Sequence, residues 1–277
     1  MNIWELLCFF TALYAAVVFA QEEDWKYENN GTAAWGDAYP ACRGTQQSPI
    51  PLTRDGAKLW WPSMQRQAGF RIDLQNYGTA QQGVFVNDGK SVALIFNYTD
   101  ISSAPHLIIL NNGSVASYSL TRLHFHWPSE HWIYNQRYPL EMHMTHRDDN
   151  NNTLVLSILF TTECSVPSDG MQTVAAAVRR VKHSGDSVPI EDFAPVRLLP
   201  PFLQRDCGYY MFPGSLTTPP CSQDVLWLVH EVPLCIGRSQ LEAFQNVERA
   251  DGGLLASNAR PLQAVNGRQV LYLPCQH

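Results

Sequence analysis

The run Leu123-His124-Phe125-His126-Trp127 alternates histidines with large apolar residues, as expected of a β-strand with one buried face. Side chains two residues apart on a strand point to the same face, so His124 and His126 can bind one metal ion together. A second run, Leu140-Glu141-Met142-His143-Met144-Thr145-His146, offers His143 from another expected strand. Three imidazoles leave the fourth tetrahedral position of a zinc ion open, which is typical of a catalytic zinc site.

The alternative interpretation is that these are hydrogen-bonded histidines on a half-buried sheet. That alternative is favoured for any single histidine. It is not favoured for a His-x-His pair that faces a second histidine-bearing strand. The sequence therefore predicts a metal site on a sheet.

Apolar runs rich in Val, Ile, Leu and aromatic residues recur between turn signals on both sides of these histidines, and we expect them to be strands of one large sheet. They are Ser91–Phe96, Leu107–Leu110, Leu120–Trp127, Leu140–His146, Leu154–Phe160, Val225–Val232 and Gln269–Leu273. Two helices are expected, and both are peripheral. One is Met171–Lys182, with Val174, Val178 and Val181 at helical spacing. The other has the capping-box pattern Ser239-Gln240-Leu241-Glu242, and Leu241, Phe244 and Val247 form its apolar stripe.

The composition is that of a folded domain. The chain has 277 residues, of which 45% are hydrophobic and 11% aromatic, enough for a large core. No repeat or low-complexity tract divides it, so one domain is expected over residues 21–277. The net charge of −6 gives no basic surface for nucleic acid, which we exclude as a partner.

Residues 1–20 are predicted to be a signal peptide. The segment is apolar apart from Glu5 and a few neutral polar residues, and it ends in Val18-Phe19-Ala20, where small residues suit signal peptidase. Glu5 is unusual in a leader, and an uncleaved membrane anchor is the alternative. The C-terminal residues are not a hydrophobic tail, so we expect no stable membrane span in the mature chain.

Secretion agrees with two further features. Outside the leader there are six cysteines, Cys42, Cys164, Cys207, Cys221, Cys235 and Cys275, an even number that suits disulfides. Zinc binding by these cysteines is the alternative, but no Cys-x-x-Cys pair is present. Asn30, Asn97, Asn112 and Asn151 each begin an N-glycosylation sequon. We expect a secreted, disulfide-bonded glycoprotein.

The run Phe212–Pro220 places two threonines before two prolines, which predicts a rigid loop bearing hydroxyl groups rather than an ordinary turn. With this loop the chain resembles the α-class carbonic anhydrases. The resemblance starts at Trp25-Lys26-Tyr27 and continues through Gln47-Ser48-Pro49, the histidine strands and Ser215–Pro220 to Asn258-Ala259-Arg260-Pro261. It covers nearly the whole mature chain in the order of that family.

The resemblance implies a mainly β fold with some α-helix, built on a large twisted, mostly antiparallel sheet of about ten strands. It also implies a zinc enzyme that reversibly hydrates carbon dioxide to bicarbonate, by attack of zinc-bound hydroxide. Carbon dioxide and bicarbonate would be its substrates, and sulfonamides and small anions its inhibitors. The alternatives are a non-catalytic secreted binding module and a matrix protein. The first is disfavoured because all three histidines are present, and the second because acidic or glycine-rich repeats are absent.

The resemblance also assigns roles to residues. His124, His126 and His143 resemble the zinc ligands, Glu141 the acceptor for the ring of His143, and Asn258 the residue whose carbonyl serves His126. Thr217 would accept a hydrogen bond from the hydroxide while Glu130 takes its proton, which aims the attacking lone pair. The Thr217 N–H would bind bicarbonate or a sulfonamide. The substrate pocket is expected to contain Val155, Leu216, Thr217, Thr218, Val225 and Trp227.

Four features depart from the family pattern. Arg122 stands where a glutamine usually accepts from the first ligand, and Thr145 replaces an apolar pocket residue. The connection from Trp127 to Glu130 is shorter than usual. Thr79 stands where fast members carry a proton-shuttling histidine, which predicts slow proton export.

The family also suggests how the cysteines pair, and the histidines outside the ligand set are expected to have structural or surface positions. Secreted members imply a Cys42–Cys221 disulfide, and the family's parallel strands favour Cys164–Cys235, which leaves Cys207–Cys275. Outside the ligand set, His131 and His146 are expected to be buried and hydrogen-bonded. The others are expected on the surface or in loops: His106, His183, His230 and His277.

Overall fold

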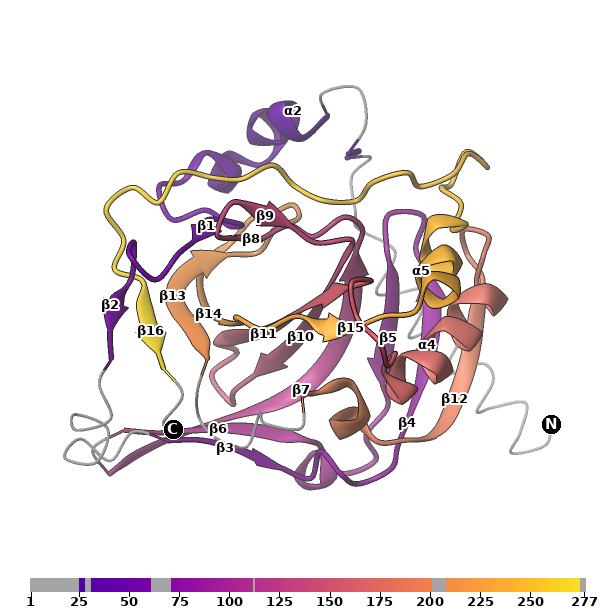
Figure 1. Ribbon diagram of the computed structural model, residues 1–277, viewed down its shortest axis with the longest axis horizontal. Helices are drawn as coiled ribbons and strands as arrows, with labels where there is room; N and C mark the ends of the chain where they lie inside the picture. Colours follow the sequence, from indigo (N-terminus) through magenta and orange to yellow (C-terminus); the bar gives the residue numbers. More distant parts are fainter. Residues whose placement is uncertain (1–24, 28–30, 61–70, 112, 201–207, 275–277) are drawn as a thin grey trace.

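One large curved sheet forms the centre of the molecule (Figure 1). The structure is a computed structural model that describes residues 25–27, 31–60, 71–111, 113–200 and 208–274. This part of the chain contains three α-helices. Figure 1 shows α4 and α5 together at one side of the sheet and α2 apart from them. They span α2 (Gly31–Ala38), α4 (Asp169–Arg180) and α5 (Arg238–Gln245).

The strands form two sheets, a large one of 13 strands and a small one of three. The small sheet consists of β1 (Pro51–Leu52), β8 (Trp132–Ile133) and β9 (Gln136–Arg137). The strands of the large sheet are β2 (Lys58–Leu59), β3 (Arg71–Gln75), β4 (Gln81–Asn87), β5 (Val92–Phe96), β6 (His106–Asn111), β7 (Ser114–His126), β10 (Leu140–Arg147), β11 (Thr153–Thr161), β12 (Ser187–Phe193), β13 (Tyr209–Ser215), β14 (Gln223–His230), β15 (Leu234–Cys235) and β16 (Leu271–Leu273).

Most neighbouring strands are antiparallel. The order is β12-β4-β5-β7-β10-β11-β14-β13-β16-β2, and β6 pairs with β7 and β3. The parallel pairs of this sheet are β11 with β14, β11 with β15, and β16 with β2. The predicted fold, mainly β with a large, mostly antiparallel sheet and short peripheral helices, is therefore confirmed. The sheet has 13 strands rather than about ten.

The additional strands are those without a clean apolar run. Tyr209–Ser215 is a strand between β14 and β16, so the loop predicted over Phe212–Pro220 begins only at Leu216. Pro213 and Gly214 disfavour a strand locally, but their pairing with Leu226 and Val225 of β14 overrides that preference. Similarly, β4 contains three polar residues and β12 contains a proline.

Both predicted helices are present, and one begins differently from the prediction. Helix α5 begins at Arg238, one residue before the expected capping residue, Ser239. Gly237 precedes its first turn, and the Gly237 N–H donates to Gln240 Oε1 at 2.9 Å. The predicted pairing of Ser239 with Glu242 is therefore wrong, because Gly237 and Gln240, two positions earlier, form the capping pair instead.

The two faces of the large sheet are chemically different. Alternate residues of β7 and β10 point to opposite faces. One face, which includes Leu123, Phe125 and Met142, belongs to the main hydrophobic core together with residues of α4 and α5. The opposite face carries His124, His126 and His143, and we call it the site face. A smaller apolar cluster, which includes Val155, Val225 and Trp227, lies on the site face.

A buried carboxylate ties several distant segments together. Glu231, just after β14, accepts both Arg54 Nε at 2.8 Å and Arg54 Nη2 at 2.7 Å. The hydroxyls of Tyr134, Tyr272 and Tyr210 donate to the same carboxylate at 2.5, 2.6 and 3.2 Å. Burial raises the pKa of Glu231, but hydrogen bonds from Arg54, Tyr134 and Tyr272 outweigh it and hold the pKa below its ordinary value. The carboxylate is therefore ionised at neutral pH.

Glu231→Gln should lower the free energy of unfolding by about 2 kcal/mol, since hydrogen bonds to a charged group are lost at a buried position. A depressed pKa contributes stability above the ordinary carboxyl pKa, and that contribution is lost as the pH falls through the native pKa. The difference between the native chain and the variant should therefore shrink below the ordinary value of 4.5. Urea unfolding at several pH values measures it. Glu242→Gln, at an exposed carboxylate on α5, is the control and should cost little. Equal losses in both variants would contradict the assignment.

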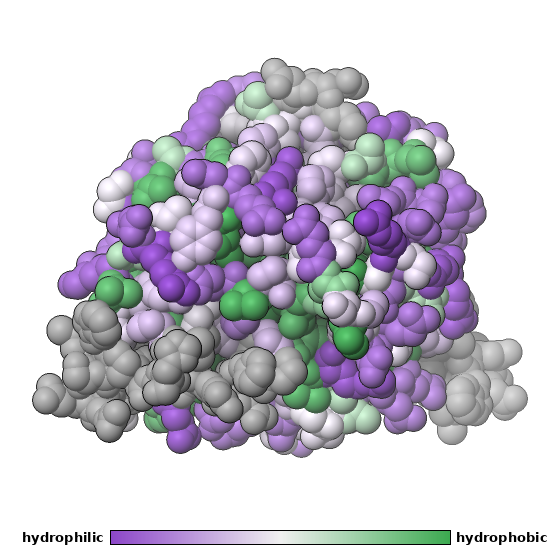
Figure 2. Space-filling model, in the orientation of Figure 1, coloured by the Kyte–Doolittle hydropathy of each residue, from purple (hydrophilic) through white to green (hydrophobic). Residues whose placement is uncertain are grey.

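The described residues contain two disulfides, Cys42–Cys221 and Cys164–Cys235. Both are pairs that the sequence analysis expects. Cys207 and Cys275 lie outside the described residues, as do residues 1–20, Asn30, Asn112 and His277, so the third disulfide stays a prediction. No helix among the described residues is long and apolar enough to cross a membrane. Figure 2 shows that hydrophilic residues cover most of one face, with small hydrophobic patches between them.

Candidate metal centre

Three imidazole rings converge on the site face. His124 and His143 are direct partners in the pairing of β7 with β10, and His126 is the partner of Glu141. The ring centroids of His124 lie 5.0 Å from His126 and 5.1 Å from His143, and those of His126 and His143 are 4.6 Å apart. One ligand atom from each ring lies within 4.8 Å of the others, close enough to share one metal ion.

Hydrogen bonds fix two of the rings and leave one nitrogen of each free. His126 Nδ1 donates to the backbone carbonyl of Asn258 at 2.8 Å, and His143 Nε2 donates to Glu141 Oε1 at 2.7 Å. His126 Nε2 is buried without a hydrogen-bond partner among the described residues. A buried nitrogen with a free lone pair beside two other imidazoles fits a zinc ion, which prefers such donors.

The rings are electrically neutral at neutral pH. Burial lowers the pKa of His126 to about 4 and also lowers that of His143. The pKa of His124 lies well below its ordinary value through burial and the nearby charge of Arg122. A neutral imidazole keeps the lone pair that a metal requires, so the three side chains are in the protonation state that binds metal.

The carboxylate of Glu141 accepts hydrogen bonds from several groups around the three rings. Its Oε1 accepts from His143 Nε2, His131 Nδ1 and Ser157 Oγ, each at 2.7 Å. Its Oε2 accepts from the backbone N–H groups of Glu130 and His131 at 2.7 and 2.8 Å. Burial raises the pKa of Glu141, but the charges and hydrogen bonds of His131 and His143 outweigh it, so the pKa lies well below its usual range.

A second group with metal-ligand geometry, His131, Glu141 and His143, overlaps the first. Its atoms already bond to one another through Glu141 Oε1, so it supports the first group rather than forming a separate site. His131 is thus buried and hydrogen-bonded, as expected. His146 is as well, because its Nε2 bonds to the Tyr77 hydroxyl.

Glu130 and Thr217 lie beside the three rings. Glu130 Oε2 is 3.4 Å from His126 Nε2 and 3.9 Å from His143 Nδ1, so the short connection from Trp127 does not displace this residue. The backbone N–H of Arg260 donates to Glu130 Oε1 at 2.8 Å. Burial raises the pKa of Glu130 to about 7, against opposing contributions from His143, Arg260 and the Thr217 hydroxyl.

The loop that carries Thr217 is braced on both sides. The Ser48 N–H donates to Ser215 Oγ at 2.9 Å, and the Ser215 N–H donates to Ser48 Oγ at 3.2 Å. A Cβ at Gly214 would lie 2.3 Å from Ser48 Oγ, so only glycine permits this close approach. Cys221, which follows the loop, is bonded to Cys42. Thr217 itself is buried.

An apolar cluster adjoins the candidate metal centre. Val155, Val225 and Trp227 are buried in one cluster, against which Leu216 packs, and Thr218 is half-buried beside Thr217. The Trp227 ring centroid is 4.8 Å from that of His143, which places this cluster directly against a candidate ligand. Thr145 pairs with Val155 across the sheet, so it lies at the edge of the same apolar surface.

Other candidate residues lie elsewhere. Thr79 is exposed in the connection between β3 and β4, and the sequon residues Asn97 and Asn151 are exposed. His106 is half-buried on β6, and His183 is exposed and bonds to Glu248. His230 was expected on the surface or in a loop, which is wrong. It is 6% exposed at the end of β14, because its ring packs on Tyr209 and bonds to the Val232 carbonyl.

The sequence analysis gave no role to several supporting groups. The guanidinium of Arg260 donates to Gln47 Oε1 at 2.8 Å and to the Ser48 carbonyl at 2.9 Å, and its backbone serves Glu130. The sequence feature that could have indicated a role for Arg260 is the motif Asn258-Ala259-Arg260-Pro261. Ser157 gave no signal, because it stands alone within an apolar strand.

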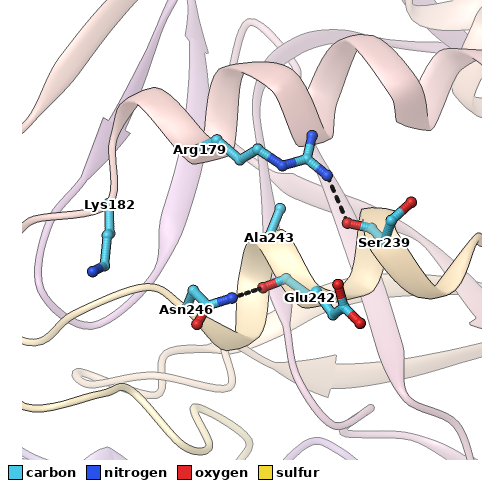
Figure 3. Close-up of a pocket in the computed structure, with 6 residues that line it drawn as sticks. All are labelled: Arg179, Lys182, Ser239, Glu242, Ala243 and Asn246. Atoms are coloured by element: carbon cyan, nitrogen blue, oxygen red, sulfur yellow. Dashed lines mark hydrogen bonds between the residues drawn. The ribbon is translucent and has the colours of Figure 1, made fainter.

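A pocket between α4 and α5 lies on the other side of the sheet (Figure 3). Its polar groups already have partners: Arg179 Nη2 donates to the Ser239 carbonyl at 2.6 Å, and Asn246 Nδ2 to the Glu242 carbonyl at 2.7 Å. Lys182 Nζ is 2.9 Å from Glu248 Oε1. We therefore assign no function to this pocket.

Comparisons with known proteins agree with this geometry. A family model described as eukaryotic-type carbonic anhydrase matches residues 30–274. Human carbonic anhydrase 7 is 28% identical over 269 residues, which are 89% of this chain and 96% of that protein. A carbonic anhydrase of Pectobacterium carotovorum is 29% identical over 255 residues, covering 90% of each protein. The solved structure of Photobacterium profundum alpha-carbonic anhydrase matches with a TM-score of 0.71 at 30% identity, covering 90% of this chain and 100% of that one.

Proposed function

The chain belongs to the eukaryotic-type carbonic anhydrase family, and from this we propose that it interconverts carbon dioxide and bicarbonate at a zinc ion held by His124, His126 and His143. Membership of this family is the basis for proposing carbon dioxide and bicarbonate as the substrates. The observation that carries the zinc assignment is the convergence of three neutral rings, two of them buried and fixed by Asn258 and Glu141.

When bound, zinc would act as a Lewis acid that lowers the pKa of a coordinated water, chemistry for which carbonic anhydrases are the established example. The protein residues orient the reactants. Glu141 and Asn258 keep the free nitrogens of His143 and His126 directed at one point. Val155, Val225 and Trp227 offer an apolar surface for carbon dioxide, beside the ring of His143.

Thr217 would orient the nucleophile. Its hydroxyl contributes a hydrogen bond to Glu130, which in its ionised form can only accept. A hydroxyl that donates to Glu130 has only lone pairs left for other partners, so it accepts from the attacking oxygen and fixes that oxygen's direction. The backbone N–H of Thr217 is the donor we assign to bicarbonate, and to sulfonamide or anion inhibitors.

We also propose that the mature protein is secreted. The two disulfides suggest an extracellular protein. The apolar segment 1–20 and the exposed sequon residues Asn97 and Asn151 support the same location. Mass spectrometry of the secreted chain tests this: it should begin near Gln21 and carry glycans.

Metal analysis beside a carbon dioxide hydration assay tests the proposed function. The purified chain should hold one zinc, lose hydration activity when a chelator removes the metal, and regain it with zinc but not magnesium. One zinc per chain without hydration would favour the alternative, a secreted binding module. Such a module would bind zinc stably but would show no carbon dioxide hydration at any pH.

Proton export should limit turnover. A side chain that relays protons at neutral pH must titrate there, and Thr79 cannot. The rate at saturating carbon dioxide should therefore rise with imidazole concentration. Thr79→His should raise that rate in weak buffer and leave the second-order rate constant for carbon dioxide nearly unchanged. Thr79→Ala, the matched control, should behave as the native chain. A native rate that is already fast and indifferent to buffer would contradict this prediction.

A further inference from the structure

His124 differs from the other two candidate ligands in what holds its ring. Its Nδ1 is buried and has no hydrogen-bond partner among the described residues, whereas His126 Nδ1 and His143 Nε2 each donate to an acceptor within 2.8 Å. Buried polar groups nearly always have a partner. The unpartnered nitrogen of His124 therefore requires a cause in its surroundings.

One neighbouring side chain on this strand face is that of Arg122. It lies two residues before His124 on β7 and thus on the same face, paired with Ile95 on β5 and Thr145 on β10. A guanidinium has five donors and no acceptor. Its Nη2 lies 3.5 Å from Asp88 Oδ2, while its Nε is also buried without a partner in the described chain. Two donors thus lie on the same strand face, and neither can accept from the other.

The orientation of His124 indicates which nitrogen faces the metal. Unlike His126 and His143, this side chain is partly exposed, yet its Nδ1 is buried. The part of the ring that is accessible to solvent therefore does not contain Nδ1. We assign Nε2 as the metal-facing nitrogen and Nδ1–H as the outer group that needs an acceptor.

We propose that Arg122 is a positioning residue that weakens zinc binding through His124, by placing a donor and a positive charge where an acceptor would hold the ring. This inference rests on the proposed zinc site. Metal-binding histidines almost always donate their outer N–H to an acceptor, which fixes the ring and raises its basicity. Here that N–H is buried without an acceptor among the described residues, so the ring is less firmly held and less basic than its two neighbours.

Three variants separate the parts of this effect. Arg122→Gln removes the charge and supplies an amide oxygen, whereas Arg122→Met removes the charge but offers no acceptor. Arg71→Gln is the matched control: Arg71 is an exposed arginine on β3, 3.4 Å from Asp73, much as Arg122 is 3.5 Å from Asp88. Zinc affinity is measured on the folded proteins by competition with a chelator of known affinity.

We expect Arg122→Gln to bind zinc about tenfold or more tightly than the native chain, the lower end of the effect of such outer partners. Arg122→Met should gain less, and Arg71→Gln should not change. Proton NMR of the zinc-loaded proteins gives a second readout. Slowly exchanging ring N–H signals should come from His126 and His143 in the native chain, and Arg122→Gln should add one from His124.

The outcomes distinguish this inference from the proposed function. If the native chain binds one zinc and Arg122→Gln binds it no more tightly, the inference is wrong and the zinc site stands. Equal gains in the Gln and Met variants would overturn the role of the missing acceptor, since removal of the positive charge alone would then explain them. Stoichiometric zinc only in Arg122→Gln would support the inference and contradict the function proposed for the native chain. Zinc binding by neither protein would contradict both.

Discussion

His143→Ala is expected to lose nearly all its zinc and its carbon dioxide hydration together. The substitution removes one of three ligands from a site that has no fourth protein ligand in the described chain. It also leaves Glu141 Oε1 without the donor that His143 Nε2 supplies. Because affinity and activity depend on the same ligand set, metal content and rate should fall in proportion.

Metal analysis and stopped-flow hydration assays on the same preparation measure both quantities. His106→Ala is the control, since it removes a half-buried histidine of β6 and leaves the three rings intact. It should keep its zinc and its activity. Full zinc occupancy in His143→Ala would show that this histidine is not a ligand, and proper folding of the variant can be checked by circular dichroism.

Thr217→Ala should retain zinc and lose activity on the order of a hundredfold, the usual effect of removing one preorganised hydrogen bond at a reacting centre. The variant leaves the three histidines and the backbone N–H of Thr217 in place. It removes the hydroxyl that contributes a hydrogen bond to Glu130, together with the neighbouring methyl group. The loss should appear in kcat/KM for carbon dioxide, since the orientation of attack is affected.

Two further variants make this result specific. Thr217→Ser keeps the hydroxyl and should restore most of the rate. Thr218→Ala, at the next residue, should affect the rate much less. An unchanged rate in Thr217→Ala would mean that another group orients the attacking oxygen. Loss of zinc from Thr217→Ala would instead show that the loop supports the metal site.

The sequence predicts the centre of this molecule better than its periphery. His124, His126 and His143 lie on strands with clean apolar alternation, so period-two reasoning places them correctly. By contrast, β12 contains Pro189 and several polar residues, and only its pairing with β4 makes it a strand. Such strands are stabilised by partners distant in sequence, which local patterns do not reveal.

The supporting contacts of the site are also non-local. Asn258 is 132 residues from His126, and Arg260 is 130 residues from Glu130, so only the family resemblance suggested the first of these contacts. The sequence showed that Arg122 cannot accept a hydrogen bond. It could not show that the Nδ1 of His124 is buried, because that depends on how neighbouring strands pack.

The segment between α5 and β16 crosses the molecule along one side (Figure 1) and brings Asn258 and Arg260 to the site. A ribosome adds those residues long after the three histidines. A nascent chain that has already emerged as far as His143 has its candidate ligands but neither the carbonyl that orients His126 nor the N–H that holds Glu130. We therefore expect zinc to be acquired only once Asn258 and Arg260 have been synthesised, and a chain interrupted before Asn258 to leave the ribosome without it.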